Sequence, residues 1–359
     1  MKCHFLTFLI LSLLTISCSS DDDNNNDNNN DPIQGTESTF SAEQLSDAAR
    51  YSEEKGGSAV LVMEDGEIIF EDYHNGADQN TAPHIYSATK LYWSAVAALA
   101  RQQGLIDYEE YVSNTITEWE DTALHPGKNE IKIKHLLTLS SGLSQNFMTI
   151  SDESDRYQYA IDELDMVSEP GEKFSYGPSN YYIFGVLLER KLHEHGIEQN
   201  PLEYLETEIF DKIGLEYDSW THDEAGNPNI PNGCYLTPRN WVKFGQFMLD
   251  KGKWNGTQII ESSLLEEMFV PTGPNPGHGN FCWLNTVNGY ALTPLDTAPD
   301  GSVGGIMYYD GYTDIIGGLG AGKNRIYLIP SLNTVVIRQT QLGEDTFEDH
   351  EFLALLLEK

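Results

Sequence analysis

The sequence predicts an α/β fold of the α+β kind: an antiparallel sheet built from both termini and flanked by helices, with an all-helical subdomain inserted. Two observations predict it. Strand patterns occur before residue 75 and return after about residue 255, whereas residues 105–250 are mostly helical in pattern. Separate runs of strands and helices are typical of a sheet that packs against helices. Hydrophobic residues make up 40% of the 359, which is enough for a core.

The elements of the N-terminal part follow in chain order. Apolar residues at helical spacing predict a short amphipathic helix over 41–55. Residues 58–74 have the pattern of two strands joined at 64–66, which indicates a hairpin. The Ala-rich stretch 91–101 has helical periodicity with few polar interruptions, and this predicts a buried helix.

The C-terminal part supplies the remaining strands. Strand patterns lie at 281–285, 325–331 and 334–340, and the last run, 347–359, has a helical pattern. We therefore expect one domain over residues 41–359. Its α/β part would comprise 41–90 and 255–359, and its mainly helical part would comprise 91–254.

The N-terminus predicts export. Residues 1–17 hold one lysine and an apolar run too short to span a bilayer, as a signal peptide does. Cys18 follows small residues, a pattern that resembles a bacterial lipoprotein signal with lipid placed on the Cys18 thiol; an ordinary signal peptide is the alternative. Residues 18–40 form an acidic, Asn-rich tether, which resembles the surface-export signal of Bacteroidetes-type lipoproteins. We expect an exported protein, lipid-anchored to the outer membrane at the cell surface.

Charge and cysteine usage exclude several partners. A net charge of −35 argues against nucleic acid and against electrostatic docking on anionic lipid, because both need clustered Lys and Arg. Cys234 and Cys282 remain after processing, and the sequence leaves open whether they are bonded or free. No CxxC, HExxH or Cys/His cluster occurs, so we expect no metal and no cofactor.

Two serine–lysine pairs have the spacing SxxK. Ser87 and Lys90 lie at the head of the Ala-rich helix, where residues three apart share a face, so the lysine can reach the hydroxyl. A serine needs an adjacent base to become a nucleophile, and a lysine serves when burial lowers its pKa. Ser52 and Lys55 have the same spacing at the end of an acidic helix, and we interpret that pair as a solvated helix end.

Two further segments suit such chemistry. Tyr176 lies in a Gly/Pro loop ahead of a helix that begins near Asn180, and a tyrosine so presented can shuttle a proton; packing in the core is the alternative. Residues 317–340 begin with a Gly-rich strand that a substrate carbonyl can approach closely. Its N–H groups could complete an oxyanion hole, and a flexible turn before a buried strand is the alternative.

The order and spacing of these segments resemble the β-lactamase-related serine hydrolases, the class C β-lactamase and DD-peptidase-like family. Blocks at 57–76, 104–119, 131–143 and 237–260 also resemble this family. The resemblance extends over roughly residues 45–345 and implies a β-lactamase/transpeptidase-like fold.

The resemblance implies a role for each candidate residue. Ser87 would be the acylated nucleophile, Lys90 would activate it and orient Tyr176, and Tyr176 would act as general base or acid. The oxyanion hole would be formed by backbone N–H groups of Ser87 and of a strand comprising Gly320, Ala321, Gly322 and Lys323.

Two motifs depart from the family pattern. The usual Tyr-x-Asn is Tyr-Gly-Pro at 176–178, and the next asparagine is Asn180; we expect Pro178 and Asn180 to lie beside the substrate. The usual Lys or His of the third motif is missing, and Lys323 would supply its charge if it points into the site. Leu139 stands where a histidine is common, at a position that we take as structural.

These departures weaken a true β-lactamase assignment, because the lactam carboxylate and amide would lose their usual partners. They fit an esterase or amide hydrolase of the same fold, similar to family VIII esterases or 6-aminohexanoate-dimer hydrolases. We therefore predict a serine hydrolase that acts on a small ester, amide or peptide through an acyl-enzyme. The alternatives are a catalytically inactive surface binding protein on this fold, and a penicillin-binding DD-peptidase or β-lactamase.

Overall fold

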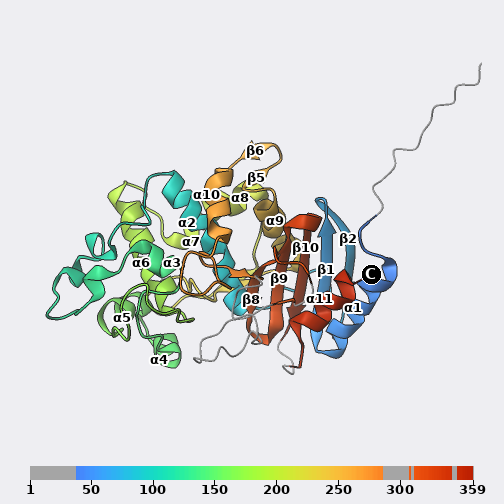
Figure 1. The fold of residues 1–359 in the computed structure, drawn as a ribbon, viewed down its shortest axis with the longest axis horizontal. Helices are drawn as coiled ribbons and strands as arrows, with labels where there is room; N and C mark the ends of the chain where they lie inside the picture. The colour runs from blue at the N-terminus through green and yellow to red at the C-terminus, as the bar shows by residue number, and fades with distance from the viewer. Residues whose placement is uncertain (1–37, 286–306, 309–310, 342–345, 359) are drawn as a thin grey trace, which may run out of the picture. The chain divides into compact units, whose positions relative to one another are not determined.

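A six-stranded antiparallel sheet, in the order β2-β1-β10-β9-β8-β7, organises the fold (Figure 1). The computed structural model describes residues 38–285, 307–308, 311–341 and 346–358. The strands are β1 (Gly57–Glu64), β2 (Glu67–Tyr73), β7 (Trp283–Leu284), β8 (Ile316–Gly320), β9 (Asn324–Ile329) and β10 (Thr334–Thr340) in the sheet, and β3 (Ser219–Trp220) with β4 (Cys234–Tyr235) and β5 (Lys253–Trp254) with β6 (Thr257–Gln258) in two short ladders.

Most of the helices lie between β2 and β7 in the chain. The helices are α1 (Ala42–Glu54), α2 (Tyr92–Gln102), α3 (Ile133–Leu137), α4 (Phe147–Asp152), α5 (Arg156–Asp162), α6 (Ser179–Glu194), α7 (Pro201–Leu205), α8 (Asp211–Ile213), α9 (Pro238–Leu249), α10 (Ser262–Glu266) and α11 (Asp349–Leu357). Capping explains where several begin: Ser41 forms a capping box with Gln44 at α1, and Thr237 accepts a hydrogen bond from the Asn240 N–H at α9.

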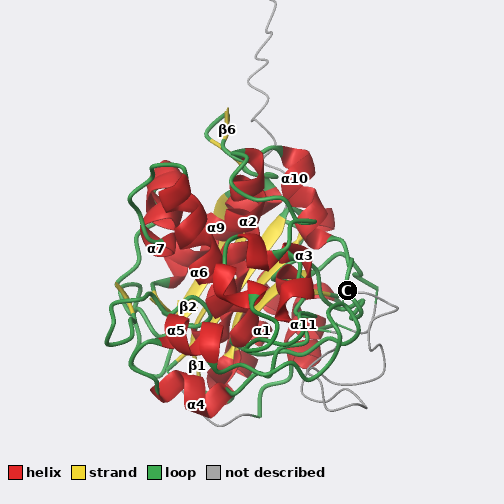
Figure 2. Ribbon diagram, turned by 90° about the vertical axis from the view of Figure 1, so that its left-hand side faces the viewer, coloured by secondary structure: helices red, strands yellow, loops and turns green. Residues whose placement is uncertain are grey.

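Helices cover both faces of the sheet (Figure 2). On β10, Val335 faces α9, because a Cβ added at Gly245 of that helix would lie 2.5 Å from the Val335 Cγ1. Arg338, three residues further on, faces the opposite side and donates a hydrogen bond of 3.0 Å to Ser52 of α1. Ser52, interpreted above as solvated, is therefore a buried partner of Arg338, with 1% of its surface exposed. α11 packs on α1, so these two helices form one outer layer and α9 belongs to the other.

The centre of the sheet joins the two ends of the chain, as the sequence predicts. β1 pairs with β10, with Gly57 opposite Thr340 at one end of the ladder. β1 and β2 form the predicted hairpin, and its turn residues Asp65 and Gly66 have φ values of 52° and 81°. An Asp-Gly turn with two positive φ angles matches the twist of its strands. The predicted fold class is confirmed.

Some details differ from the predictions or complete them. Phe40, at the end of the predicted tether, is 5% exposed and belongs to the core. α9, inside the stretch predicted for the helical part, packs on β1, β9 and β10. Cys234 and Cys282 are free, buried thiols. The predicted signal peptide, Cys18 and residues 19–37 lie outside the described residues.

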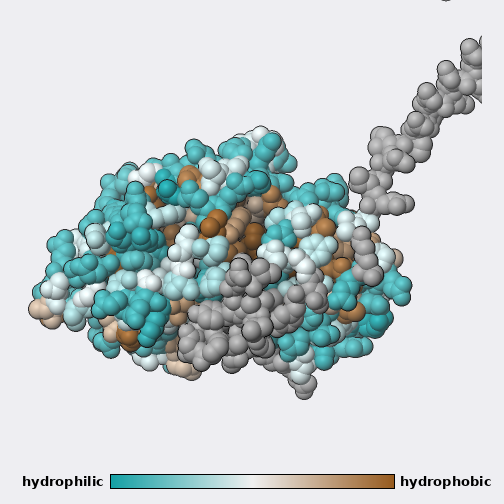
Figure 3. Space-filling model, viewed as in Figure 1, coloured by the Kyte–Doolittle hydropathy of each residue, from teal (hydrophilic) through white to brown (hydrophobic). Residues whose placement is uncertain are grey.

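The surface is mostly polar on the face shown in Figure 3, with apolar side chains gathered in a hollow near its middle. A pocket of about 330 Å³ lies between the C-terminal end of α9 and the β7–β8 edge, and apolar residues including Phe269, Ile315 and Ile316 line it. In the described part of the chain, no helix has both the length and the apolar character needed to cross a bilayer.

Candidate active site

A 3-10 turn, Tyr86–Leu91, carries Ser87 and Lys90 into α2. Residues three apart eclipse one another in such a turn, and the Lys90 Nζ lies 3.0 Å from the Ser87 Oγ. Tyr86 opens the turn with a φ of 50°, which is uncommon for a residue with a side chain, and its ring packs against His84 with centroids 3.9 Å apart. Ser87 thus lies in the first turn, where backbone N–H groups have no acceptor within the helix.

Lys90 is buried, with 4% of its surface exposed. Its Nζ donates to Ser87 Oγ at 3.0 Å, to Pro231 O at 3.1 Å and to Asn232 Oδ1 at 3.1 Å. Burial lowers the pKa of Lys90 to about 7. At neutral pH a substantial fraction of this lysine is uncharged, and an uncharged amine beside a serine can accept its proton.

Tyr176 lies at the same place. Its ring centroid is 5.4 Å from the Lys90 Nζ, and it packs against Trp283 at 5.3 Å. The loop is held by Leu139, whose carbonyl accepts a hydrogen bond of 2.8 Å from the Ser175 N–H. The structure therefore brings together Ser87, Lys90 and Tyr176, which the sequence singled out.

The phenols that face the lysine carry no charge at neutral pH. Burial raises the pKa of Tyr176 to about 12, although a hydrogen bond with Ser87 and the charge of Arg325 act in the opposite direction. Tyr181, whose ring centroid is 5.2 Å from the Lys90 Nζ, also has its pKa raised by burial. Tyr176 can therefore donate its phenolic proton in this site. As a neutral phenol it is a poor base.

Asn232, which the sequence analysis did not single out, completes the cluster. Its Oδ1 accepts a hydrogen bond of 2.9 Å from the Ser87 hydroxyl in addition to the one from Lys90. Asn232 and Ser87 are 145 residues apart in the sequence. In the sequence, Asn232 and Gly233 have only the pattern of a turn. No local signal could therefore identify this asparagine.

β8 borders the site on the side of the sheet. It passes so close to the Ser87 turn that a Cβ at Gly320 would lie 2.0 Å from the Ile85 carbonyl oxygen, so only glycine fits there. A Cβ at Gly318 would lie 3.3 Å from the Ala88 carbonyl oxygen. The two glycines therefore let the strand and the nucleophile turn approach closely.

The outer edge of β8 is covered over only part of its length. β7 pairs with it as far as Gly317, opposite Trp283. The Asn285 N–H donates to Ile315 O at 2.8 Å, so the backbone groups of Ile315 face this edge. Every second residue along a strand turns its N–H and C=O to the same side, so those of Gly317 and Leu319 face this edge too. The Leu319 N–H thus lies beyond the end of β7, without a strand partner among the described residues.

The predicted strand 320–323 is wrong for three of its four residues. Only Gly320 belongs to β8, and Ala321–Lys323 form a turn that leads into β9. Gly322 and Lys323 have φ values of 67° and 61°, in the left-handed region, and such angles reverse the chain instead of extending it.

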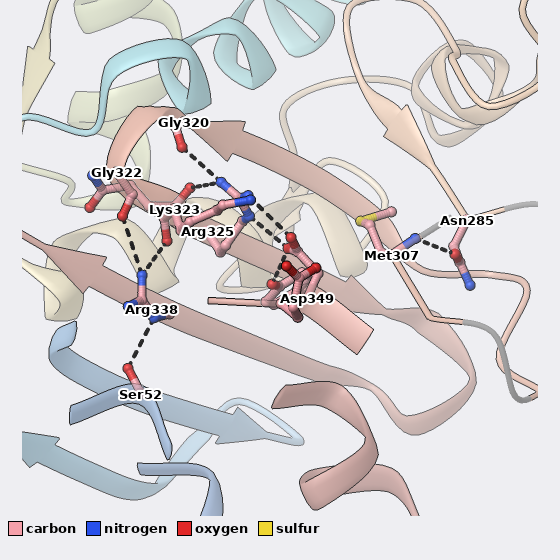
Figure 4. A network of polar contacts seen from close by, with 12 residues as sticks. Ser52, Asn285, Met307, Gly320, Gly322, Lys323, Arg325, Arg338 and Asp349 are labelled. Carbon is pink, nitrogen blue, oxygen red and sulfur yellow. Dashed lines mark hydrogen bonds and ion pairs between the residues drawn. The ribbon is translucent and has the colours of Figure 1, made fainter. Parts of the chain in front are cut away.

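Two buried arginines donate hydrogen bonds to backbone carbonyls at the two ends of this turn (Figure 4). Arg325 donates to Gly320 O at 2.7 Å and forms an ion pair of 2.6 Å with Asp349, and Arg338 donates to Lys323 O at 2.7 Å. Burial acts to raise the pKa of Asp349, but Arg325, the hydrogen bond from Tyr327 and, to the smallest extent, Lys323 outweigh it, and the pKa is lowered. The Lys323 charge therefore contributes to the low pKa of Asp349.

Pro178 and Asn180 do not take the predicted places beside a substrate. Pro178 is the N-cap residue of α6, and Asn180, in its first turn, has no exposed surface. Neither polar atom of the Asn180 side chain has a hydrogen-bond partner among the described residues. The asparagine beside the serine and lysine is Asn232 instead.

The described residues bring a serine hydroxyl, a buried lysine, a protonated tyrosine and an edge N–H group to one place. They contain no group of three or more His, Cys, Asp or Glu side chains that could hold a metal ion. The arrangement fits attack by a hydroxyl on a carbonyl carbon, with the negative charge received by backbone N–H groups.

Comparison with known proteins identifies a family and solved structures of the same fold. A family model described as beta-lactamase matches residues 43–337. A solved structure from Bacteroides dorei, provisionally described as a beta-lactamase, superposes with a TM-score of 0.67 at 17% identity and covers 89% of this chain and 100% of that one. A second, from Bacillus anthracis and provisionally described as a 6-aminohexanoate-dimer hydrolase, has a TM-score of 0.65 at 18% identity, over 84% and 78% of the two chains.

A curated relative is similar at the level of sequence. The acyltransferase calJ of Penicillium decumbens is 28% identical over 295 residues, which cover 64% of this chain and 67% of that protein.

Proposed function

The chain belongs to the beta-lactamase family, and on that premise we propose that it is a serine hydrolase that cleaves a small ester or amide through an acyl-enzyme on Ser87. The observation that carries the proposal is the contact of 3.0 Å between the Ser87 Oγ and a buried lysine with a pKa near 7. Serine hydroxyls are weak nucleophiles until a neighbouring base takes their proton.

The first half-reaction would form the acyl-enzyme. Uncharged Lys90 takes the proton of Ser87 as the Oγ attacks the substrate carbonyl carbon. The N–H groups of Ser87 and Leu319 receive the oxyanion, because Ser87 lies in the first turn of its helix and the Leu319 N–H lies beyond the end of β7, without a strand partner among the described residues. The bond from the carbonyl carbon to the leaving oxygen or nitrogen then breaks.

The leaving group needs a proton, and Tyr176 is suited to give it. Its phenol is protonated at neutral pH, and it can recover a proton from the Lys90 ammonium, which faces its ring. In the second half-reaction, water attacks the acyl-enzyme, the carboxylic acid leaves, and Ser87 regains its proton.

Replacing Tyr176 with phenylalanine is expected to lower kcat by roughly 10²–10⁴-fold, the range for loss of a general acid–base group. The loss should be largest for amides and alkyl esters, whose leaving groups need a proton, and smallest for 4-nitrophenyl esters, whose leaving group does not. Steady-state kinetics on the two kinds of substrate measure this. A uniform loss, or none, would mean that Tyr176 serves packing alone.

The charges near β8 support an uncharged substrate. Lys323 and Arg325 act on Asp349, and Arg338 binds backbone carbonyls. Residues 286–310, which connect β7 to β8, contain no Lys, Arg or His. β8 itself, Ile316–Gly320, contains no Lys, Arg or His. A carboxylate such as that of a β-lactam or a D-Ala-D-Ala end would therefore lack a cationic partner on this strand, which favours an esterase or amidase over the DD-peptidase alternative.

A matched pair of esters tests this preference. The 4-nitrophenyl monoester of succinic acid carries a carboxylate, whereas its methyl ester does not. We expect kcat/KM to be roughly 10–100-fold higher for the uncharged compound, because hydrogen bonds to a charged group contribute about 1.5–3 kcal/mol and this site would not supply them. A preference for the carboxylate would favour a penicillin-binding function.

Acyl transfer is the second candidate, favoured by the sequence similarity to the acyltransferase calJ. An acyl-enzyme can pass its acyl group to an alcohol or amine instead of water. Product analysis with a small alcohol present separates the two reactions, because transfer yields the exchanged ester and hydrolysis yields the acid.

A further inference from the structure

We infer that Asn232 is a positioning residue for the Ser87–Lys90 pair, one that directs the lysine lone pair at the serine hydroxyl. The inference rests on the proposed function and adds to it a residue outside the predicted motifs. It stands on the contacts of one side chain and of the loop that carries it.

The amide orientation of Asn232 follows from its neighbours. The Ser87 hydroxyl and the Lys90 ammonium both donate to its Oδ1, at 2.9 Å and 3.1 Å. The reverse orientation would place an NH2 group against these donors, which is unfavourable. The amide oxygen has two lone pairs, and each of them has a partner here.

The contacts of Lys90 define two states. As an ammonium it has three N–H donors and three acceptors, namely Ser87 Oγ, Pro231 O and Asn232 Oδ1. After loss of one proton the amine keeps two N–H groups and gains a lone pair. Pro231 O and Asn232 Oδ1 can accept only, so they take the two N–H groups, and the lone pair is left to face Ser87.

The loop that carries Asn232 is fixed by side-chain donors to successive backbone carbonyls. These are Trp220 Nε1 to Asn229 O at 3.1 Å, Trp93 Nε1 to Ile230 O at 2.6 Å, Lys90 Nζ to Pro231 O at 3.1 Å and His84 Nε2 to Asn232 O. The next residue, Gly233, packs so closely on Trp220 that a Cβ there would lie 2.1 Å from the Nε1. A loop held at four carbonyls keeps its asparagine in place before the reaction begins, as positioning requires.

The surroundings of Lys90 make its protonation sensitive to the side chain at position 232. The groups that face it are Ser87, the phenols of Tyr176 and Tyr181, and the Asn232 amide, all uncharged at neutral pH. His84, which binds the Asn232 carbonyl from the other side, has its pKa lowered by burial. Among the described residues, no carboxylate forms an ion pair with Lys90. A carboxylate at position 232 would be its first charged neighbour.

Asn232→Asp and Asn232→Ala test the inference through the pH dependence of labelling of Ser87 by a fluorophosphonate, followed by intact mass. In wild type the labelling rate should rise with pH through about pH 7, as Lys90 loses its proton. Asn232→Asp should move this rise at least one pH unit upward, because a carboxylate stabilises the ammonium, so labelling at pH 7 falls at least about fivefold. Asn232→Ala should lower the plateau rate roughly 10–100-fold without an upward shift.

Asn229→Asp is the matched control, because it adds the same charge to the same loop. Asn229 accepts a hydrogen bond from Tyr182 and donates one to Thr221, away from the lysine. We expect its pH profile to match that of wild type. Equal shifts in the two Asp variants would mean a general effect of charge, and unchanged profiles in both Asn232 variants would overturn the inference.

A second measurement separates this inference from the proposed function. NMR titration of the Lys90 side chain, with its signal assigned by loss in Lys90→Arg, gives its pKa without turnover. Suppose that the Lys90 pKa shifts upward in Asn232→Asp, but that wild type is not labelled by the fluorophosphonate at any pH. That result would refute the hydrolase proposal and leave the contact between Asn232 and Lys90 supported. Labelled wild type with no shift in either variant would refute the role of Asn232 alone.

Discussion

Replacing Ser87 with alanine is expected to lower kcat/KM by at least about 10⁴-fold, to the level of the uncatalysed reaction assisted by binding alone. The substitution removes the oxygen that forms the acyl bond and leaves the 3-10 turn intact. The Ser87 Oγ accepts a hydrogen bond from Lys90 and donates one to Asn232, and without it Lys90 keeps its contacts with Pro231 O and Asn232 Oδ1. The thermal unfolding temperature should therefore stay close to that of wild type.

Intact mass after fluorophosphonate treatment measures the result directly. Wild type should gain one adduct, and Ser87→Ala should gain none. Ser52→Ala is the matched control, since Ser52 has the same SxxK spacing but is buried beneath Arg338 on the other side of the sheet; it should keep the adduct. An adduct on Ser87→Ala would place the nucleophile elsewhere, and a folded wild type without an adduct would favour the inactive binding protein.

Replacing Lys90 with methionine is expected to slow acylation by roughly 10²–10⁴-fold, because Ser87 loses its base while the site keeps a side chain of similar length. Lys90→Arg is the informative companion. Arginine keeps a positive charge but does not lose its proton at any accessible pH, so it should be equally inactive up to pH 10. Recovery of activity in Lys90→Arg would mean that charge, and not proton transfer, is what the site needs from this residue.

The same lysine predicts how stability depends on pH. Its pKa is about 7 when folded and near its ordinary value when unfolded. Between these two values the unfolded chain binds one proton more than the folded chain, so the free energy of unfolding should rise with pH in this window. Lys90→Met should lack this part of the rise. Thermal melts of both proteins across pH 6–10 provide the measurement and show that the variant is folded.

The parts of the site that depend on local geometry could be predicted from the sequence. Ser87 and Lys90 lie three residues apart, so any helical turn brings them together. Tyr176 was found through the order of the motifs. The hairpin at Asp65 and Gly66 and the buried helix after Lys90 followed from turn chemistry and periodicity in the same way.

The parts that depend on tertiary contacts could not be predicted. Asn232 reaches Ser87 only because its loop is held by side chains from distant elements. At the third motif, the sequence does not reveal the residue at which β8 ends. The left-handed angles at Gly322 and Lys323 turn the chain there, and a shift of one residue along a strand reverses the face to which a side chain points. The sequence therefore suggested a strand that continues to Lys323, whereas the structure ends β8 at Gly320.

The pairing of β1 with β10 has a consequence for how the molecule is made. β1 leaves the ribosome before helices α2 to α10 and β10 follows them, so the two central strands of the sheet cannot pair until all of these helices have been made. Until then β1 keeps one unpaired edge, which can join other chains, and closing so long a loop is slow. A nascent chain of this protein therefore completes its sheet late, which leaves time for a chaperone to hold it unfolded.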